Sequence, residues 1–258
     1  MNKKIKKIIN KKNKSKIICL TAYSKNIAEE VDNFADITLV GDSLGSVLYN
    51  YNTTRKVTLS NMIEHSKSVK MGIKKSLMVV DMPFNTYNSK SDALKNARKI
   101  IKETRCDAVK LEGGKKIINQ INYLIKNNIP VMGHLGLLPQ SIKGKFKSTG
   151  KTNHEKRKLL NDSILLEKSG VFAIVLECIK TSTAQQMTEK LKIPTIGIGS
   201  SKYCDGQVLV TDDLIGLNNT KIRFVKKFVN IKKYIKLGLK KFRSEVKLKK
   251  YPSQKHSY

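Results

Sequence analysis

The chain has 258 residues, of which 40% are hydrophobic and 28% are charged, so it is long enough and apolar enough to bury a full core. Its formal net charge of +31 is typical of nucleic-acid-binding proteins, but only six of the 51 basic residues are arginine, and no zinc-finger, RNP-like or basic-zipper pattern occurs. The four cysteines form no CxxC pair, which argues against a structural zinc site and a disulfide framework.

The excess positive charge is interpreted as a solvated lysine surface. Nucleic-acid binding is the alternative, and retention on heparin and duplex DNA across a salt series would test it. The longest apolar runs, such as residues 17–20 and 77–80, are much too short to cross a bilayer, and the N-terminus has no apolar secretory segment. We therefore expect a soluble, cytoplasmic protein with no membrane association and no specific nucleic-acid partner.

The chain opens with MNKKIKKIINKKNKSK, in which Ile5, Ile8 and Ile9 fall at helical spacing and predict a short docking helix. Eight short apolar runs follow, and we predict that each contains a strand. They span residues 17–23, 36–43, 76–84, 107–114, 129–137, 171–179, 193–201 and 206–216.

Stretches of helical character separate most of these runs. In residues 91–105, for example, Ala93, Ala97 and Ile100 lie on one helical face. Alternating strands and helices imply parallel strands, and eight strands in about 200 residues favour a (β/α)8 TIM barrel over an open doubly wound sheet. Residues 231–246 predict a terminal helix packed on the outside. Because no linker divides the chain, we expect one barrel domain over residues 1–258, with the N-terminal and C-terminal helices packed outside it.

Polar and ionisable residues stand at the C-terminal ends of five of the predicted strands. They are Asp42, Asp81, Lys110 with Glu112, His134 and Glu177. Lys110 and Glu112 are two residues apart in AVKLEGG, so they share one face of their strand. In a barrel the C-terminal strand ends surround a single mouth, and we expect these side chains to converge there on one site.

Each of these residues also has an ordinary structural explanation when it is taken alone. An aspartate after a strand commonly caps a turn or a helix, His134 fits a hydrogen-bonded core histidine, and Lys110 neutralises Glu112. One shared site accounts for all of them together more simply than separate caps do. The glycines of IGIGSS, residues 196–201, do not match GxGxxG, so they predict close backbone packing at the mouth instead.

The three clustered carboxylates favour a hard divalent cation such as Mg²⁺, since no soft-ligand cluster competes. Asp42, Asp81 and Glu112 are the candidate ligands. A metal held there is suited to chelate a 2-oxo acid and to stabilise its enolate. Glu177 is then left to remove the proton from the adjacent carbon.

Ten blocks in order along the chain carry a resemblance to a known family. They are TAY, LVGDSLGSV, VTLSNMIEH, VVDMPF, AVKLEGG, IPVMGHLGLLPQS, IVLEC, IPTIGIG, CDGQVLV and the closing YP…HSY. From about Thr21 to its last residue, the chain resembles the ketopantoate hydroxymethyltransferase family. The resemblance implies a (β/α)8 barrel and a magnesium ion. It also implies transfer of a hydroxymethyl group from 5,10-methylenetetrahydrofolate to 3-methyl-2-oxobutanoate, giving 2-dehydropantoate in the first step of pantothenate synthesis.

The resemblance also implies roles for individual residues. It makes metal ligands of Asp42, Asp81 and Glu112. It places on the substrate Asp42, Ser43, Asp81 and Lys110, with His134 lining the pocket. Glu177, in IVLEC, takes the position of the proton acceptor. Besides its small-molecule substrates, the family implies a homo-oligomer, a decamer.

Three positions depart from the family pattern. Ser24 stands where the family usually has aspartate, GKFKSTGK (residues 144–151) replaces GGYKVQGK, and IGIGSS replaces IGIGAG. The last two lie near the expected mouth and bear on folate affinity more than on chemistry. A magnesium-dependent lyase or mutase on a related barrel is the other enzyme hypothesis. Such enzymes commonly use a reactive cysteine in a mobile loop, and no KKCGH-like block occurs here.

Overall fold

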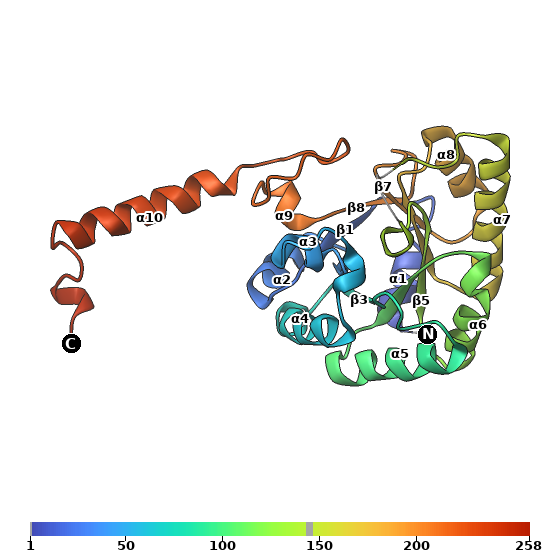
Figure 1. Ribbon diagram of the computed structural model, residues 1–258, viewed down its shortest axis with the longest axis horizontal. Helices are drawn as coiled ribbons and strands as arrows, with labels where there is room; N and C mark the ends of the chain where they lie inside the picture. Colours follow the sequence, from blue (N-terminus) through green and yellow to red (C-terminus); the bar gives the residue numbers. More distant parts are fainter. Residues whose placement is uncertain (1, 143–146) are drawn as a thin grey trace. The chain divides into compact units, whose positions relative to one another are not determined.

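The computed structural model describes residues 2–142 and 147–258, and in it strands β1 to β8 close into one parallel barrel in chain order (Figure 1). The strands are β1 Ile17–Thr21, β2 Ile37–Val40, β3 Leu77–Asp81, β4 Ala108–Glu112, β5 Val131–Gly136, β6 Ala173–Glu177, β7 Thr195–Ile198 and β8 Gly206–Leu209. Each lies inside one of the eight predicted runs. The predicted (β/α)8 barrel is therefore confirmed.

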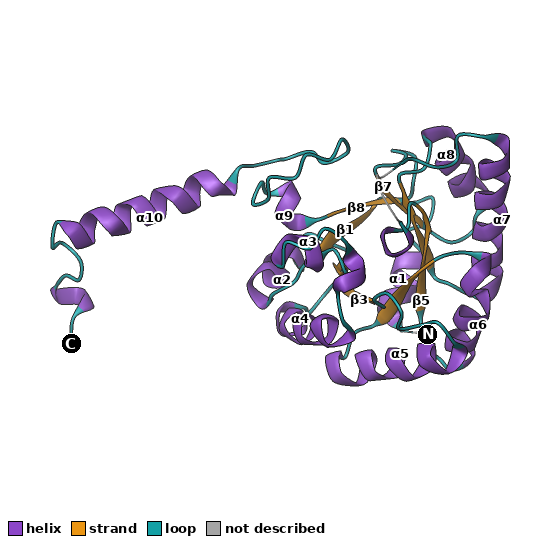
Figure 2. Cartoon of the chain, viewed as in Figure 1, coloured by secondary structure: helices purple, strands orange, loops and turns teal. Residues whose placement is uncertain are grey.

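Helices surround the strands of the barrel, as Figure 2 shows. They are α2 Lys25–Val31, α3 Leu44–Leu48, α4 Leu59–Gly72, α5 Lys90–Thr104, α6 Ile118–Lys126, α7 Asn153–Ser169 and α8 Thr181–Lys190, with the short 3-10 turns η1 Thr54–Lys56, η2 Lys115–Ile117 and η3 Pro139–Ser141. Thr58 and Thr152 begin α4 and α7 with capping boxes, in which the threonine and the side chain three residues later satisfy free backbone N–H groups.

The N-terminal helix α1, Lys3–Ile9, covers the end of the barrel where the strands begin. Its Ile5 and Ile8 are buried in one cluster with the first residues of three strands, Ile17, Ile37 and Leu77. Burying two isoleucines there contributes roughly 3–6 kcal/mol of hydrophobic stabilisation. The predicted docking helix is confirmed, but it closes the lower opening of the barrel and does not pack on its outer wall.

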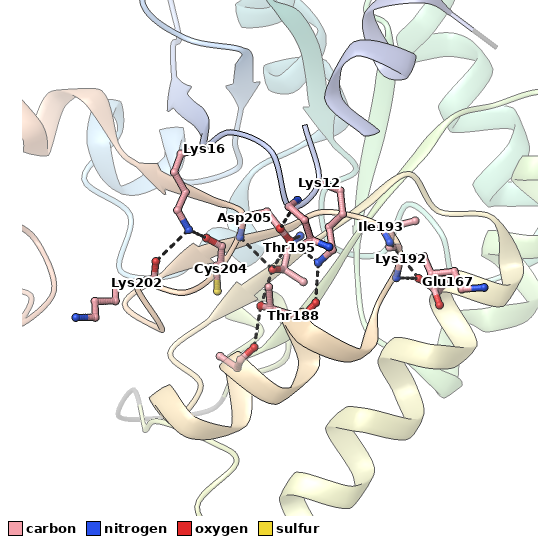
Figure 3. A network of polar contacts seen from close by, with 12 residues as sticks. Lys12, Lys16, Glu167, Thr188, Lys192, Ile193, Thr195, Lys202, Cys204 and Asp205 are labelled. Atoms are coloured by element: carbon pink, nitrogen blue, oxygen red, sulfur yellow. Dashed lines mark hydrogen bonds and ion pairs between the residues drawn. The ribbon is translucent and has the colours of Figure 1, made fainter. Parts of the chain in front are cut away.

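Lysines of this N-terminal segment pair with aspartates that precede strands. The pairs are Lys4 with Asp107 at 3.7 Å, Lys11 with Asp36 at 2.6 Å and Lys12 with Asp205 at 2.8 Å. Figure 3 shows the last pair, in which Lys12 Nζ also donates to the carbonyl of Thr188 at 2.6 Å. Part of the lysine excess is thus used to attach the N-terminus to the barrel.

The chain divides into two compact units, residues 1–210 and residues 211–258. The second contains α9 Thr211–Leu214, α10 Ile231–Lys247 and η4 Gln254–His256. As predicted, α10 is an amphipathic helix. Its apolar side chains, Phe242 among them, are exposed, and it has no buried residue. The packing of this helix on the barrel and the single domain over residues 1–258 stay predictions. No helix among the described residues is long and apolar enough to cross a membrane.

Candidate active site

Strand register brings the predicted residues together at the mouth of the barrel. Asp81 at the end of β3 lies beside Lys110 on β4, and Glu112 lies beside His134 on β5. All four are almost fully buried. Glu177 ends β6 and is more accessible, with 16% of its side chain exposed. A strand therefore carries both Lys110 and Glu112 on one face because both point into a shared polar site.

Lys110 is held in its charged form despite its burial. Its Nζ lies 3.2 Å from Asp81 Oδ1 and 3.3 Å from His134 Nδ1. Burial alone would lower the pKa of this lysine, but the neighbouring charges of Asp81 and Glu112 outweigh burial and raise the pKa above its ordinary value. A buried, permanently charged ammonium at the mouth is suited to bind an anion.

Asp42 and Asp81 form the crowded part of the site. The backbone N–H of Asp42 donates to Asp81 Oδ2 at 3.1 Å, which brings the two side chains next to each other. Burial, followed by the charges of Glu112 and Asp81, raises the pKa of Asp42 well above its usual range. Burial also raises the pKa of Asp81, against the effect of Lys110. Asp81 Oδ1 accepts no hydrogen bond of good geometry, although Lys110 is its ion-pair partner.

His134 connects Glu112 with Glu177. Its Nδ1 lies 3.5 Å from Glu112 Oε1, and its Nε2 lies 3.3 Å from Glu177 Oε2. Burial and Lys110 lower the pKa of His134, but the two glutamates prevail and raise it to about 9. Nδ1 cannot accept a hydrogen bond from Lys110 while it donates one to Glu112. The raised pKa of His134 favours the protonated imidazole, in which Nδ1 donates to Glu112. The same contact lowers the pKa of Glu112 against the effect of burial.

Ser43 lies at the rim of the site, directly before α3. Its side chain is half-buried, and its Oγ is 2.8 Å from the hydroxyl of Tyr23. Gly41, two residues earlier, lies close to the same hydroxyl: a Cβ at Gly41 would be 2.8 Å from Ser43 Oγ. A side chain at Gly41 would therefore displace the Ser43 hydroxyl, whereas Asp81 Oδ2, at 3.5 Å from the Cβ position, is at ordinary contact distance.

Two left-handed residues shape the neighbouring part of the mouth. Gly136 at the end of β5 has φ +100°, and a Cβ there would meet the carbonyl of Glu177 at 2.2 Å. Cys178 has φ +51°, a conformation that is uncommon for a residue with a side chain. The chain therefore turns sharply directly after Glu177, as strained residues often do beside functional groups.

Gln140 belongs to the site and was missed by the sequence analysis. Its backbone N–H donates to Glu112 Oε2 at 3.0 Å, and its Nε2 donates to Asp42 Oδ2 at 2.8 Å. The residue is uncharged and lies on η3, not at a strand end, so a search for ionisable strand-end residues passed over it. Its presence in the PQS part of a family block was the available signal.

The three predicted metal ligands do not form a ready-made cluster. Within residues 2–142 and 147–258, no group of three His, Cys, Asp or Glu side chains is arranged to hold a metal ion. Asp42 and Asp81 are adjacent, whereas the Glu112 oxygens face His134 and Gln140. The donors still fit a hard divalent cation, because three buried carboxylates outnumber the two cationic side chains beside them, Lys110 and His134. In addition, Asp81 Oδ1 accepts no hydrogen bond of good geometry.

Comparison of the whole sequence with known proteins shows the family to which the chain belongs. The sequence profile described as ketopantoate hydroxymethyltransferase matches residues 2–254. The chain belongs to this family. It is 63% identical over 258 residues to a 3-methyl-2-oxobutanoate hydroxymethyltransferase of Pelagibacter ubique, covering all of both chains. The enzyme of the same name from Rhizobium etli is 46% identical over 246 residues, which cover 94% of this chain and 90% of the relative.

More distant solved structures share the fold alone. A phosphoenolpyruvate phosphomutase from Streptomyces platensis superposes with a TM-score of 0.63 at 9% identity, covering 95% of this chain and 86% of that one. A phosphonopyruvate hydrolase in complex with oxalate and Mg²⁺ gives a TM-score of 0.62 at 8% identity, with coverages of 98% and 93%. These likenesses support the barrel architecture and carry no statement about substrate.

The departures from the ketopantoate hydroxymethyltransferase pattern fall in different surroundings. Ser24 is exposed and begins α2 without a side-chain cap. Residues 144–146 of GKFKSTGK lie outside the described part of the chain. In IGIGSS, Gly199 has φ +55° and Ser200 Oγ donates to the carbonyl of Ile179 at 3.2 Å. The serine thus ties the β7 end to the β6 end, in keeping with the predicted close packing.

Proposed function

We propose that the chain transfers a hydroxymethyl group from 5,10-methylenetetrahydrofolate to 3-methyl-2-oxobutanoate. The product is 2-dehydropantoate, and the reaction is the first step of pantothenate and coenzyme A synthesis. Family membership and 63% identity along the full length support this assignment. The observation that carries it is the buried set of Asp42, Asp81, Lys110 and Glu112 at the mouth, with Glu177 beside it.

Lys110 and Ser43 are assigned to the binding of the 2-oxo acid. The ammonium of Lys110 is a point charge that attracts the substrate carboxylate, and charge-assisted hydrogen bonds are roughly twice as strong as neutral ones. Ser43 offers a hydroxyl at the rim, oriented by Tyr23. His134 lines the same pocket between Lys110 and Glu177.

Asp42, Asp81 and Glu112 are assigned to a magnesium ion, with Asp42 and Asp81 also contacting the substrate. When bound, magnesium supplies a Lewis acid for the keto oxygen of the 2-oxo acid. The protein contributes a dry, negatively charged recess in which the two aspartates repel each other until a cation is present. Burial is the main cause of the raised pKa of both aspartates, and the charge of Glu112 adds to it in each.

Glu177 is assigned as the base that takes the proton from C3 of 3-methyl-2-oxobutanoate. It stands at the accessible edge of the site, and its Oε2 lies 3.3 Å from His134 Nε2, which makes no hydrogen bond of good geometry. Proton removal leaves the electron pair of the C–H bond on the substrate as an enolate. Water breaks the two C–N bonds of the methylene group, which releases tetrahydrofolate and leaves the one-carbon unit as formaldehyde. The enolate carbon then attacks the formaldehyde carbon, the C=O π electrons become an alkoxide, and the alkoxide takes up the proton held by Glu177.

Exchange of the C3 hydrogen with deuterated water tests this assignment without folate. The wild-type chain is expected to exchange only with magnesium, and Glu177→Gln is expected to slow exchange about 10²–10⁴-fold while it still binds the 2-oxo acid. Glu189→Gln is the matched control, because it makes the same change on the exposed face of α8. Absence of exchange by the wild-type chain would refute the chemistry, and wild-type exchange by Glu177→Gln would refute the base.

The family resemblance also implies a homo-oligomer, a decamer, and the cysteine pattern together with the apolar runs predicts a cytoplasmic location. Both stay predictions. Sedimentation velocity of the purified chain measures the first, with a species ten times the 29.1 kDa subunit as the expected result. A monomer over the whole concentration range would contradict it.

A further inference from the structure

Gln140 sits at the centre of a hydrogen-bond network that the assigned roles do not use. It lies on η3 after Pro139, whose fixed φ favours the start of the turn. Its side chain is 2% exposed, as buried as the carboxylates around it. A glutamine this deep is costly to bury unless all its polar atoms find partners.

Every polar atom of the Gln140 side chain has a partner of the right kind. Nε2 donates to Asp42 Oδ2 at 2.8 Å and to the carbonyl of Met82 at 3.0 Å, while Oε1 accepts from the hydroxyl of Tyr87. A flipped amide would place Oε1 against two acceptors, so these partners fix the orientation. Burial, together with the charge of Glu112, raises the pKa of Tyr87 above its ordinary value, so the phenol keeps its proton and donates.

Gln140 thereby joins two carboxylates that otherwise repel each other. Asp42 follows β2 and Glu112 ends β4, and Gln140 holds the first through its side chain and the second through its backbone N–H. A lysine or arginine at this position would bind the same oxygens but would also neutralise their charge. A neutral amide orients the oxygens and leaves their negative charge available for a cation.

We propose that Gln140 is the positioning residue of the metal site, which sets Asp42 and Glu112 in place for magnesium, with Tyr87 fixing the orientation of its amide. The inference rests on the proposed function, because it needs these two carboxylates to be ligands. Partners that orient metal ligands are typically worth about 10–100-fold in metal affinity.

Titration of magnesium chloride into the chain by calorimetry tests the proposal. Gln140→Met keeps the length and volume of the side chain but removes both donors, so we expect magnesium to bind about 10–100-fold more weakly. Tyr87→Phe removes one neutral hydrogen bond from the amide, so we expect a loss of about 2–10-fold. Thr104→Val is the control, since Thr104 is equally buried and loses its bond to the carbonyl of Ile100 far from the carboxylates.

The melting temperature of each variant, measured without magnesium, separates positioning from general destabilisation. A positioning role predicts that Thr104→Val lowers the melting temperature with wild-type magnesium affinity, and that excess magnesium restores C3 exchange to Gln140→Met. Magnesium affinity of Gln140→Met within twofold of wild type would overturn the proposal. So would an equal loss of affinity in Thr104→Val. If Gln140→Met does not fold, the Tyr87→Phe titration decides by the same criterion.

Failure of this inference is distinguishable from failure of the proposed function. A wild-type chain that binds no magnesium and exchanges no C3 hydrogen refutes the metal site itself, and Gln140 loses its role with it. A wild-type chain that does both, beside a Gln140→Met variant of equal affinity, refutes only the role of Gln140.

Discussion

The two ends of the barrel surround their buried aspartates in opposite ways. Where the strands begin, Asp205 accepts from the backbone N–H of Thr195 at 2.8 Å and pairs with Lys12 at 2.8 Å. Where the strands end, Asp42 faces the negative charges of Asp81 and Glu112, and burial among them raises its pKa. At the first end the three aspartates that directly precede strands each have a lysine partner, whereas the mouth holds more carboxylates than the two cationic side chains, Lys110 and His134, can neutralise. The first arrangement serves stability, and the second leaves charge for a ligand.

Asp32 extends the contrast at the end where strands begin. Its carboxylate accepts from the backbone N–H groups of Lys74, Lys75 and Ser76, and from the hydroxyl of Ser76. Burial would raise the pKa of Asp32, but these hydrogen bonds prevail and lower it. Asp32 and Asp42 are both little exposed, yet their pKa shifts have opposite signs. Asp32 lies nearer the surface and accepts several hydrogen bonds, whereas Asp42 lies deeper, accepts one from Gln140 and has neighbours of like charge.

The largest expected effect is on turnover, and it comes from removing the carboxylate of Asp42 at the mouth of the barrel. Asp42→Asn removes one charge from the crowded carboxylates, so turnover should fall at least about 10²-fold through loss of metal binding. The same change relieves repulsion, so the metal-free variant should unfold at the wild-type free energy or above it. Product formation and urea denaturation in a chelator measure the two quantities. A clear loss of stability in the chelator would contradict the contrast between the ends.

The reverse result is expected where the strands begin. Asp205→Asn leaves Lys12 buried without its partner, and breaking a buried pair in this way costs about 3 kcal/mol or more of unfolding free energy. The folded fraction should keep its rate of product formation, because Asp205 precedes β8 at the opposite end of the barrel from the proposed active site. Urea denaturation and activity per folded molecule are the measurements. Loss of activity without loss of stability would show that Asp205 serves the reaction and not the stability of the fold.

A pH series sharpens the comparison at Asp32. Its folded pKa lies below the unfolded value of about 3.9, so its contribution is present above that value and is lost as the pH falls through the folded pKa. Wild type should therefore exceed Asp32→Asn by about 1–3 kcal/mol of unfolding free energy at pH 7, and the difference should begin to shrink below about pH 4 and be smallest below the folded pKa. Denaturation curves at several pH values measure the difference. A difference that stays constant down to pH 3 would rule out this linkage.

The smallest effect is expected on the outer wall, away from both ends. Lys25 pairs with Glu29 at 3.3 Å within α2, and about half of each side chain is exposed. Lys25→Ala should change the unfolding free energy by no more than about 0.5 kcal/mol, because water and salt screen such pairs. Chemical denaturation at low and high salt measures the change. A loss of unfolding free energy comparable with that of Asp205→Asn would show that the exposure of an ion pair does not predict its contribution to stability in this protein.

The barrel was predictable from the sequence because its signals are local. Each strand is a short aliphatic run, and residues such as Ala93, Ala97 and Ile100 repeat with the helical period between runs. The charged part of the site was predictable for a related reason. Lys110 and Glu112 stand two residues apart on one strand, and the barrel places all strand ends at one mouth.

Contacts between residues far apart in the chain were not predictable. Gln140 reaches Asp42 across 98 positions, and an uncharged residue in a turn carries no pattern that reveals such a partner. Lys12 and Asp205 are 193 positions apart, and in a chain with 51 basic residues nothing distinguishes Lys12 from its neighbours. Because lysines occur throughout the chain, the lysines of the N-terminal segment also gave no indication that its helix closes the end of the barrel.

Attachment of the N-terminus to the last strand also bears on the order of assembly. β1 pairs with β8, and Lys12 finds its acceptor only at Asp205, so a nascent chain that has not yet emerged past that residue cannot complete the ring. Until then Ile5 and Ile8 lack part of their enclosure, and the first strand keeps an open edge. Such long-range pairings slow folding, because the ends of a long loop must meet before any contact rewards them. Emergence of Asp205 and β8 from the ribosome is therefore the earliest point at which the barrel can close and the strand ends can form one mouth.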